Sequence, residues 1–155
     1  MKLVARVLAT FFFCGYVPVA PGTVGSLAAV ALGWLTVHFA GDNPLRHLIH
    51  AVVLTPFAIW SAGVMARESG FADPQAVVVD EVVGQWIALA GATHFNWKSV
   101  TAAFVLFRLF DIWKPPPARQ LETLHGGTGI VMDDVAAGAY AALVLLAAGV
   151  WFNLY

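Results

Sequence analysis

Long runs without a charged residue alternate with short polar segments along this chain. Three runs have about the 20 residues that a helix needs to cross a bilayer, namely 23–41, 47–66 and 135–155. Two shorter runs, 82–97 and 99–107, are separated only by Lys98 and predict a helical hairpin that is short or tilted. The pattern therefore predicts an all-α, polytopic membrane bundle of about five hydrophobic helices.

The first residues follow a different pattern, because Lys2 and Arg6 interrupt an apolar stretch. This arrangement predicts an N-terminal helix that is amphipathic or partly embedded, with both cations at the membrane interface. A cleaved signal peptide is the alternative, since residues 18–20 resemble a cleavage site, but no polar domain follows them. We expect residues 1–155 to form a single membrane-embedded domain.

Composition agrees with a lipid-embedded chain. Sixty per cent of the residues are hydrophobic and 11% are charged, with a mean hydropathy of +0.79. The formal net charge of −1 excludes a strongly basic surface for nucleic acid. Cys14 is the one cysteine, so an internal disulfide and a cysteine-built zinc site are both excluded.

The distribution of Lys and Arg predicts the sidedness of the bundle. If the five runs are successive spans, the segments 1–22, 67–81 and 108–134 all emerge on one side. That side carries six of the eight Lys and Arg residues, and the other side carries Arg46 and Lys98. Positively charged loops tend to stay in the cytoplasm. The sequence therefore predicts a multi-pass protein whose charged side faces the cytoplasm.

Glycines and hydroxyls gather at the start of the first long run. Gly22 and Gly25 allow a ligand to approach the backbone closely, and Thr23 and Ser26 place hydroxyls at the mouth of a helix. Free N–H groups and the helix dipole favour an anion there. The alternative is that Thr23 or Ser26 only caps the helix.

Two acidic doublets, Asp80-Glu81 and Asp133-Asp134, lie on the predicted cytoplasmic side. Adjacent carboxylates at a lipid boundary repel each other and stay ionised more easily beside a cation. Oxygen-only ligands suit Mg²⁺, with Mn²⁺ as a substitute. The alternatives are that the first doublet only favours a helix N-terminus and that Asp134 is an N-cap.

Charged residues are concentrated in the segment 108–134 of this otherwise apolar chain. Arg108, Asp111 and Lys114 recur every three residues and so share one helix face, where the first two could simply pair. Three prolines then end this helix near Lys114 and form a stiff arm that presents Arg119 and Glu122.

The arm leads into a glycine-rich loop. We expect His125 to donate hydrogen bonds or position a ligand rather than act as a nucleophile. Gly126 and Gly127 indicate a tight backbone before the last helix.

Carboxylates beside Lys and Arg at a membrane face suggest chemistry on the phosphate ester of a lipid. The motifs of covalent phosphatases are missing, since the chain has neither an Asp-x-Asp nucleophile nor a cysteine phosphate loop. Direct attack by metal-activated water is therefore the first mechanism to consider.

Four motifs together resemble the phosphatidylglycerophosphatase A family over roughly residues 7–150: PGTVGS at 21–26, DEVVG at 80–84, RLFDIWKPPP at 108–117 and GGTGIVMDD at 126–134. The resemblance implies an integral enzyme of the bacterial inner membrane that depends on Mg²⁺. It also implies the substrate, because members of the family hydrolyse phosphatidylglycerophosphate to phosphatidylglycerol and inorganic phosphate.

The resemblance also suggests a role for each motif residue. Metal ligation falls to Asp80, Glu81, Asp133 and Asp134, which are also the predicted catalytic residues. Phosphate contacts fall to Thr23, Lys114 and Arg119, with Ser26 and Arg108 beside them and Asp111 completing the shell. Glu122, His125, Gly126 and Gly127 are predicted to support the site.

Two other readings of the charged face stay open. A non-catalytic membrane assembly subunit would need no metal site. A small transporter with a charged cytoplasmic gate predicts ionisable residues in mid-span, and the longest runs contain none. The sequence leaves open whether the chain forms a homo-oligomer.

Overall fold

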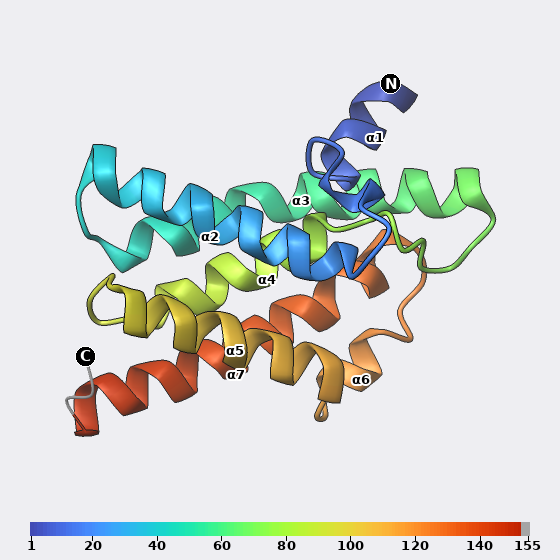
Figure 1. The fold of residues 1–155 in the computed structure, drawn as a ribbon. Coiled ribbons are helices and arrows are strands. Elements are labelled where there is room, and N and C mark those ends of the chain that lie inside the picture. Colours follow the sequence, from blue (N-terminus) through green and yellow to red (C-terminus); the bar gives the residue numbers. More distant parts are fainter. Residues whose placement is uncertain (153–155) are drawn as a thin grey trace.

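The computed structural model describes the backbone of residues 1–152 and the side chains of residues 1–150. Within this part of the chain all regular structure is helical, which confirms the predicted fold class (Figure 1). The elements are α1 (Lys2–Ala9), the 3₁₀ helix η1 (Cys14–Tyr16), α2 (Pro21–Ala40), α3 (Pro44–Ser69), α4 (Val79–Ala90), α5 (Trp97–Trp113), α6 (Ala118–Leu121) and α7 (Gly127–Phe152).

Three helices are long and apolar enough to cross a membrane: Pro21–Ala40, Pro44–Ser69 and Gly127–Val150. The predicted hairpin corresponds to α4 and α5. With 12 residues, α4 is only about 18 Å long, well short of the roughly 30 Å hydrocarbon core. The 17 residues of α5 make it longer than the predicted run 99–107. By length and composition together, three of the described helices therefore qualify as spans, and α4 and α5 are not among them.

The short helix α4 is the centre of the bundle. It packs against α2, α3, α5 and α7, with α2 and α3 on one side and α5 and α7 on the other (Figure 1). The backbones of α4 and α7 approach closely at Gly84, where a Cβ would lie only 2.7 Å from the carbonyl oxygen of Asp134. This close approach requires glycine, and it brings the two acid-bearing helices together.

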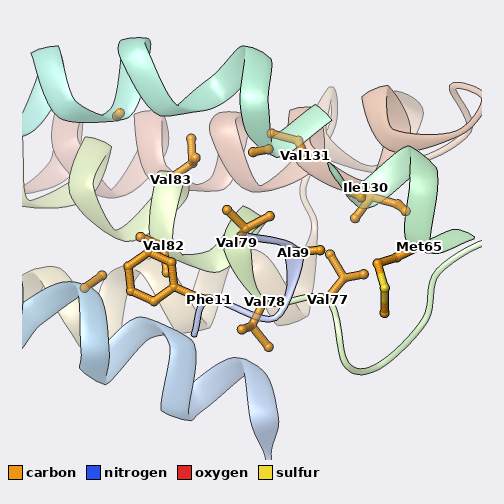
Figure 2. Close-up of a cluster of buried hydrophobic side chains, with 14 residues drawn as sticks. Ala9, Phe11, Met65, Val77, Val78, Val79, Val82, Val83, Ile130 and Val131 are labelled. Carbon is orange, nitrogen blue, oxygen red and sulfur yellow. The ribbon is translucent and has the colours of Figure 1, made fainter. Parts of the chain in front are cut away.

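A buried apolar cluster supports the first turn of α4 (Figure 2). Val78, Val79 and Val82 are fully buried there, together with Val131 of α7. Because Asp80 and Glu81 follow Val79 directly, this packing fixes the place where their carboxylates emerge. Large apolar side chains are instead exposed on the outer faces of the long helices, among them Leu35, Val52, Val53, Phe57 and Leu143, as lipid-facing surfaces require.

The loops divide between the two ends of the bundle as the pattern of runs predicts. Figure 1 shows α1, the α3–α4 connection and the segment with α6 at one end, and the α2–α3 and α4–α5 turns at the other. The three polar segments therefore share one end of the molecule, which we call the polar end.

Two helix boundaries differ from the expected ones. The last helix begins at Gly127, eight residues before the predicted run, because its glycines allow it to pack closely on α3. Asp134 therefore lies inside the second turn of α7, and its reading as an N-cap is wrong. The N-cap of α2 is Ala20, so capping by Thr23 or Ser26 is wrong as well. The predicted helix end near Lys114 is confirmed, since α5 ends at Trp113.

Candidate metal centre and phosphate site

Three carboxylates from two helices meet at the polar end. Asp80 and Glu81 lie in the first turn of α4, and Asp134 lies in the second turn of α7. One oxygen from each lies within 4.8 Å of the other two. We call these residues the acid trio. Asp80 and Asp134 are only 7% and 4% exposed, so the trio is shielded from bulk water.

Burial leaves these carboxylates short of partners. Within the described residues, one buried oxygen of each trio member makes no hydrogen bond: Oδ1 of Asp80, Oε2 of Glu81 and Oδ2 of Asp134. A buried carboxylate without a partner is costly, and three together repel one another. A cation between them removes both costs, so the trio can hold a metal ion.

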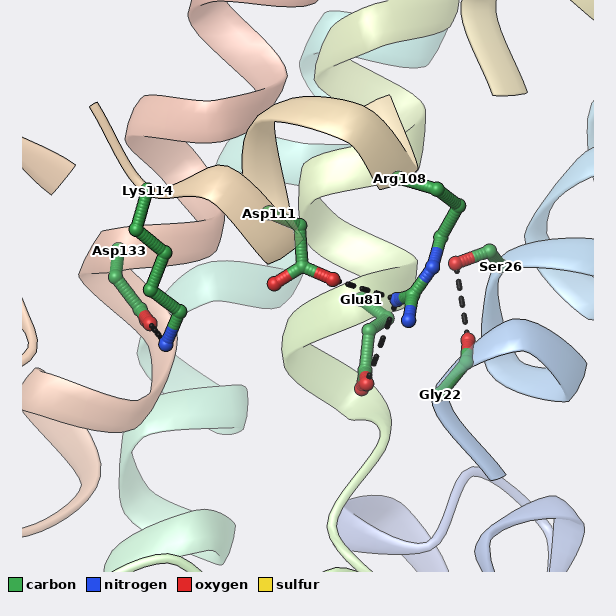
Figure 3. Close-up of polar contacts among 7 residues, drawn as sticks. All are labelled: Gly22, Ser26, Glu81, Arg108, Asp111, Lys114 and Asp133. Atoms are coloured by element: carbon green, nitrogen blue, oxygen red, sulfur yellow. Dashed lines mark hydrogen bonds and ion pairs between the residues drawn. The ribbon is translucent and has the colours of Figure 1, made fainter. Parts of the chain in front are cut away.

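The fourth predicted ligand, Asp133, does not join the trio. Successive residues of a helix differ by about 100° in direction, so Asp133 and Asp134 face different neighbours. The Oδ2 atom of Asp133 instead accepts a hydrogen bond of 2.7 Å from Nζ of Lys114 (Figure 3). Its Oδ1 atom is buried and has no hydrogen-bond partner among the described residues.

Arg108 of α5 contacts the trio through Glu81. Its Nη1 atom lies 2.7 Å from Oδ2 of Asp111 and 3.8 Å from Oε1 of Glu81 (Figure 3). The short pair with Asp111 is the expected contact along one helix face, and it holds the guanidinium beside Glu81. The site thus combines carboxylates with a cation that can contact a phosphate oxygen.

Lys114 is the second cation of the site and caps the C-terminus of α5. Its Nζ atom lies 3.0 Å from Oε1 of Glu122 as well as 2.7 Å from Asp133. Burial alone would lower the pKa of Lys114, but the hydrogen bonds to Asp133 and Glu122 outweigh it and raise the pKa. Lys114 therefore carries its positive charge throughout the physiological pH range.

The start of α2 closes the site from a third direction. A Cβ on Gly22 would collide with Oε1 of Glu81 and lie 3.2 Å from Nη1 of Arg108, so glycine lets both side chains keep these places. Thr23 is half-buried in the same helical turn. The hydroxyl of Ser26 donates to the carbonyl of Gly22 at 3.0 Å, so it stabilises this turn and its proton does not point to a ligand (Figure 3).

Two cavities open beside these groups. The first, of about 560 Å³, is lined by residues of the loop before α2 and by Asp80, Glu81 and Arg108. The second, of about 580 Å³, is lined by Asp133, Glu122, His125 and Gly126 and by the end of α3. We call them the trio cavity and the outer cavity. Asp73, in the α3–α4 connection, lines both.

Asp73 was not among the predicted site residues. Burial of its carboxyl group among protein atoms raises its pKa above the ordinary aspartate value; the charge of Lys114 opposes this rise, and Glu122 adds to it. The residue carries no motif of its own. Its place in the short polar segment before Asp80 was the one available signal.

The remaining predicted residues lie farther from the trio. Arg119, in α6, is exposed and lines neither the trio cavity nor the outer cavity. Gly126 has a φ of +67°, so it makes the turn into α7, and Gly127 is the first residue of that helix. The structure thus brings together the acid trio, Arg108 and Lys114, and leaves Arg119 at the periphery.

An α-helical membrane protein with buried carboxylates and two cations at one end has the groups that a metal-assisted enzyme acting on phospholipids needs. Similarity to known proteins identifies the enzyme family. A family model described as phosphatidylglycerophosphatase A matches residues 7–149, and the chain belongs to this family.

Three relatives are similar to this chain over most of their length. The phosphatidylglycerophosphatase A of Escherichia coli is 36% identical over 143 residues, which cover 90% of this chain and 80% of the relative. The Haemophilus influenzae protein of the same name is 38% identical over 147 residues, 94% and 89% of the two chains. A Bacteroides thetaiotaomicron protein, named as a candidate phosphatidylinositol-3-phosphatase, is 42% identical over 152 residues, 93% and 92% of the two chains.

The chain is therefore a bacterial membrane enzyme, a phosphatidylglycerophosphatase whose substrate is a phospholipid. No solved structure matches it.

Proposed function

We propose that the protein hydrolyses phosphatidylglycerophosphate at the cytoplasmic face of the inner membrane, using a divalent metal ion held by Asp80, Glu81 and Asp134. The unpartnered buried oxygens of these three carboxylates carry the proposal. Asp133 is paired with Lys114, so we assign it to orienting that lysine rather than to the first ligand shell.

Mg²⁺ fits this donor set best, because the ligands are hard oxygens that leave room for water, and Mn²⁺ is the natural substitute. When bound, the ion would supply Lewis acidity toward a phosphate oxygen and toward a water molecule. The oxygen-only donors and their negative charge support this assignment over a softer metal.

The surrounding residues then bind and neutralise the phosphate. Arg108, held by Asp111 at 2.7 Å, faces the trio cavity and can donate to a phosphate oxygen. Lys114, at the C-terminus of α5, supplies a second, permanent positive charge. The water oxygen would attack phosphorus as the P–O bond to glycerol breaks; one proton of the water ends on the departing glycerol oxygen, and the remaining OH stays on the released phosphate. Negative charge that builds up on the phosphate is stabilised by the two cations.

The cytoplasmic orientation rests on charge. The polar end carries Lys2, Arg6, Arg67, Arg108, Lys114 and Arg119, whereas the opposite end carries only Arg46 and Lys98. The positive-inside rule then places the polar end in the cytoplasm. We further propose that α4 and α5 complete five passes of the chain, with α4 shielded from lipid by its four neighbours.

Phosphatidylinositol 3-phosphate is a second candidate substrate. The relative with 42% identity is named for phosphatidylinositol 3-phosphate, whose phosphomonoester is attached to an inositol ring. The trio would meet the same phosphomonoester in either lipid. The acid trio, Arg108 and Lys114 would contact the phosphate in both lipids, so they do not distinguish a glycerol head group from an inositol head group.

Phosphate release from the purified protein in detergent micelles tests this proposal. The two lipids are compared with phosphatidic acid, each with Mg²⁺ and with excess chelator. We expect hydrolysis of phosphatidylglycerophosphate that disappears with chelator and returns with Mg²⁺ or Mn²⁺. Asp80→Asn and Asp134→Asn should lower kcat by about 10³-fold or more, because a lost ligand weakens both binding and activation.

Asp42→Asn is the matched control. Asp42 lies at the opposite end of the bundle, where Oδ2 accepts a hydrogen bond of 3.0 Å from the backbone of Phe95, and an amide can still accept it. This variant should keep full activity. A rate that persists in chelator, or full activity in both trio variants, would overturn the metal mechanism.

A further inference from the structure

One cation beside the outer cavity forms no ion pair with any described residue. Within the described residues, four of the six cations at the polar end form ion pairs, namely Lys2, Arg6, Arg108 and Lys114. Arg67 and Arg119 have no carboxylate of a described residue within 4.0 Å, and of these two only Arg67 lines the outer cavity. Glu68, next to Arg67 in sequence, is already engaged by Lys2 at 3.4 Å and Arg6 at 3.5 Å.

Tight helix packing fixes where Arg67 lies. A Cβ on Gly127 would lie 2.6 Å from the backbone nitrogen of Gly63, so α3 and α7 touch at these two glycines. The point where a Cβ of Gly63 would stand is 3.5 Å from Nη1 of Arg67 and 3.3 Å from the nitrogen of Gly127. The guanidinium therefore lies beside the same turn of α3 that packs on the first residue of α7.

The position of the Arg67 guanidinium determines how far it lies from the acid trio. Gly127 precedes Asp134 by seven residues, which corresponds to about 10 Å along the helix axis. Arg67, Asp133 and Asp73 all line the outer cavity. Asp73 in turn borders the trio cavity, so the two cavities adjoin.

We infer that Arg67 binds the phosphodiester of the substrate while the trio end of the site holds its phosphomonoester. The inference rests on the proposed function and adds the substrate class: phospholipids whose head group carries a phosphomonoester one polyol away from the diester. Such a lipid has two anionic groups separated by a short carbon chain or ring. The site offers a matching pair of places, a metal-capable trio and a guanidinium free to form a bidentate pair with phosphate.

The arrangement also predicts selectivity between phospholipids. Phosphatidic acid has a phosphomonoester but no diester, so it can reach the trio without engaging Arg67. Phosphatidylglycerophosphate and phosphatidylinositol 3-phosphate both carry the diester and gain the second contact. Arg67 is thus a specificity-determining residue that acts in binding and leaves the hydrolytic step to the trio.

Substitution of Arg67 tests the inference in the full-length protein in micelles. Arg67→Gln should lower kcat/KM for phosphatidylglycerophosphate by about ten- to hundredfold, the effect of losing a charge-assisted pair. It should leave kcat/KM for phosphatidic acid, or its inhibition constant if it is not turned over, at the wild-type value. Arg67→Lys should recover part of the loss, since it keeps the charge and loses the bidentate geometry.

Arg6→Gln is the matched control, because it removes one positive charge from the same end outside the outer cavity. It should preserve the preference between the two lipids. Phosphatidylglycerol, which has the diester alone, supplies a second measurement: its inhibition constant should rise about tenfold in Arg67→Gln and stay unchanged in Arg6→Gln.

Equal losses on phosphatidylglycerophosphate and phosphatidic acid in Arg67→Gln, or an unchanged inhibition by phosphatidylglycerol, would overturn the role of Arg67. A wild-type protein that does not release phosphate from phosphatidylglycerophosphate would instead overturn the proposed function. The two failures are therefore distinguishable in one set of assays.

Discussion

The Nζ atom of Lys114 lies 2.7 Å from Oδ2 of Asp133, and this pair joins the C-terminus of α5 to the second turn of α7. The side chain of Asp133 is 6% exposed and that of Lys114 is 24% exposed. The pair therefore anchors a buried carboxylate next to Asp134, a member of the acid trio. It links the stability of the bundle to the geometry of the site.

Removal of Lys114 should destabilise the protein as well as slow catalysis. Lys114→Ala leaves a buried Asp133 carboxylate without its cation, which should lower the free energy of unfolding by about 2 kcal/mol, less than for a fully buried pair because the lysine is partly solvated. The Tm in detergent should fall accordingly. Adding Asp133→Asn should restore the Tm without restoring activity, since an amide needs no counter-ion. A Tm for Lys114→Ala equal to that of the wild type would refute this account.

The pH dependence of stability should report on Asp73. Its pKa is raised in the folded protein, mainly by burial, so the unfolded chain loses this proton first as the pH increases. From about pH 4 up to the raised pKa, the folded state holds more protons, and the free energy of unfolding therefore falls.

Asp73→Asn removes this contribution. In chelator, its Tm should decline less than that of the wild type when the pH is raised from about 4 to 7. Thermal unfolding in detergent at a series of pH values makes the comparison. Two parallel curves would show that Asp73 has the same pKa in both states.

The sequence was sufficient to predict that Asp80 and Asp134 meet, although 53 positions separate them along the chain. Successive apolar runs send alternate connections to opposite ends of a bundle, so both acidic doublets had to emerge together. The helix end at Lys114 was equally predictable, because three prolines follow it.

The different contacts of Asp133 and Asp134 could not be predicted from the sequence. It depends on the helical phase of α7, and the early start of α7 depends on Gly127 packing against Gly63 of α3. A glycine-rich segment normally indicates a loop, and only tertiary contact turns it into the first turn of a helix. Arg67 and Asp73 were missed for a similar reason, since their role follows from the cavity that they share and from no motif.

Metal binding should stabilise the folded enzyme. Mg²⁺ removes the repulsion among buried carboxylates, so by mass action it should raise the free energy of unfolding by about 2.7 kcal/mol when its concentration is 100 times the dissociation constant. The Tm should rise with it. Asp134→Asn should lose most of this Mg²⁺-dependent shift. Asp42→Asn, at the other end of the bundle, should keep it. An equal shift in both variants would indicate an ion bound elsewhere.

The close approach of α2 to the site leads to the last prediction. Gly22→Ala places a methyl group against Oε1 of Glu81 and 3.2 Å from Nη1 of Arg108, and both side chains must move away. Glu81 would be displaced from its trio partners, so kcat/KM should fall by about 10²-fold, as expected when a catalytic group is displaced by about an ångström.

Gly33→Ala is the matched control in the same helix. A methyl group there would meet the end of the Leu89 side chain at 3.2 Å and the ring of Phe95 at 3.3 Å, far along the helix from the trio. It should leave kcat/KM unchanged, and Gly22→Ala should lower it even at temperatures well below its Tm. If the two variants have equal activity, the contact between α2 and Glu81 does not set the geometry of the metal site.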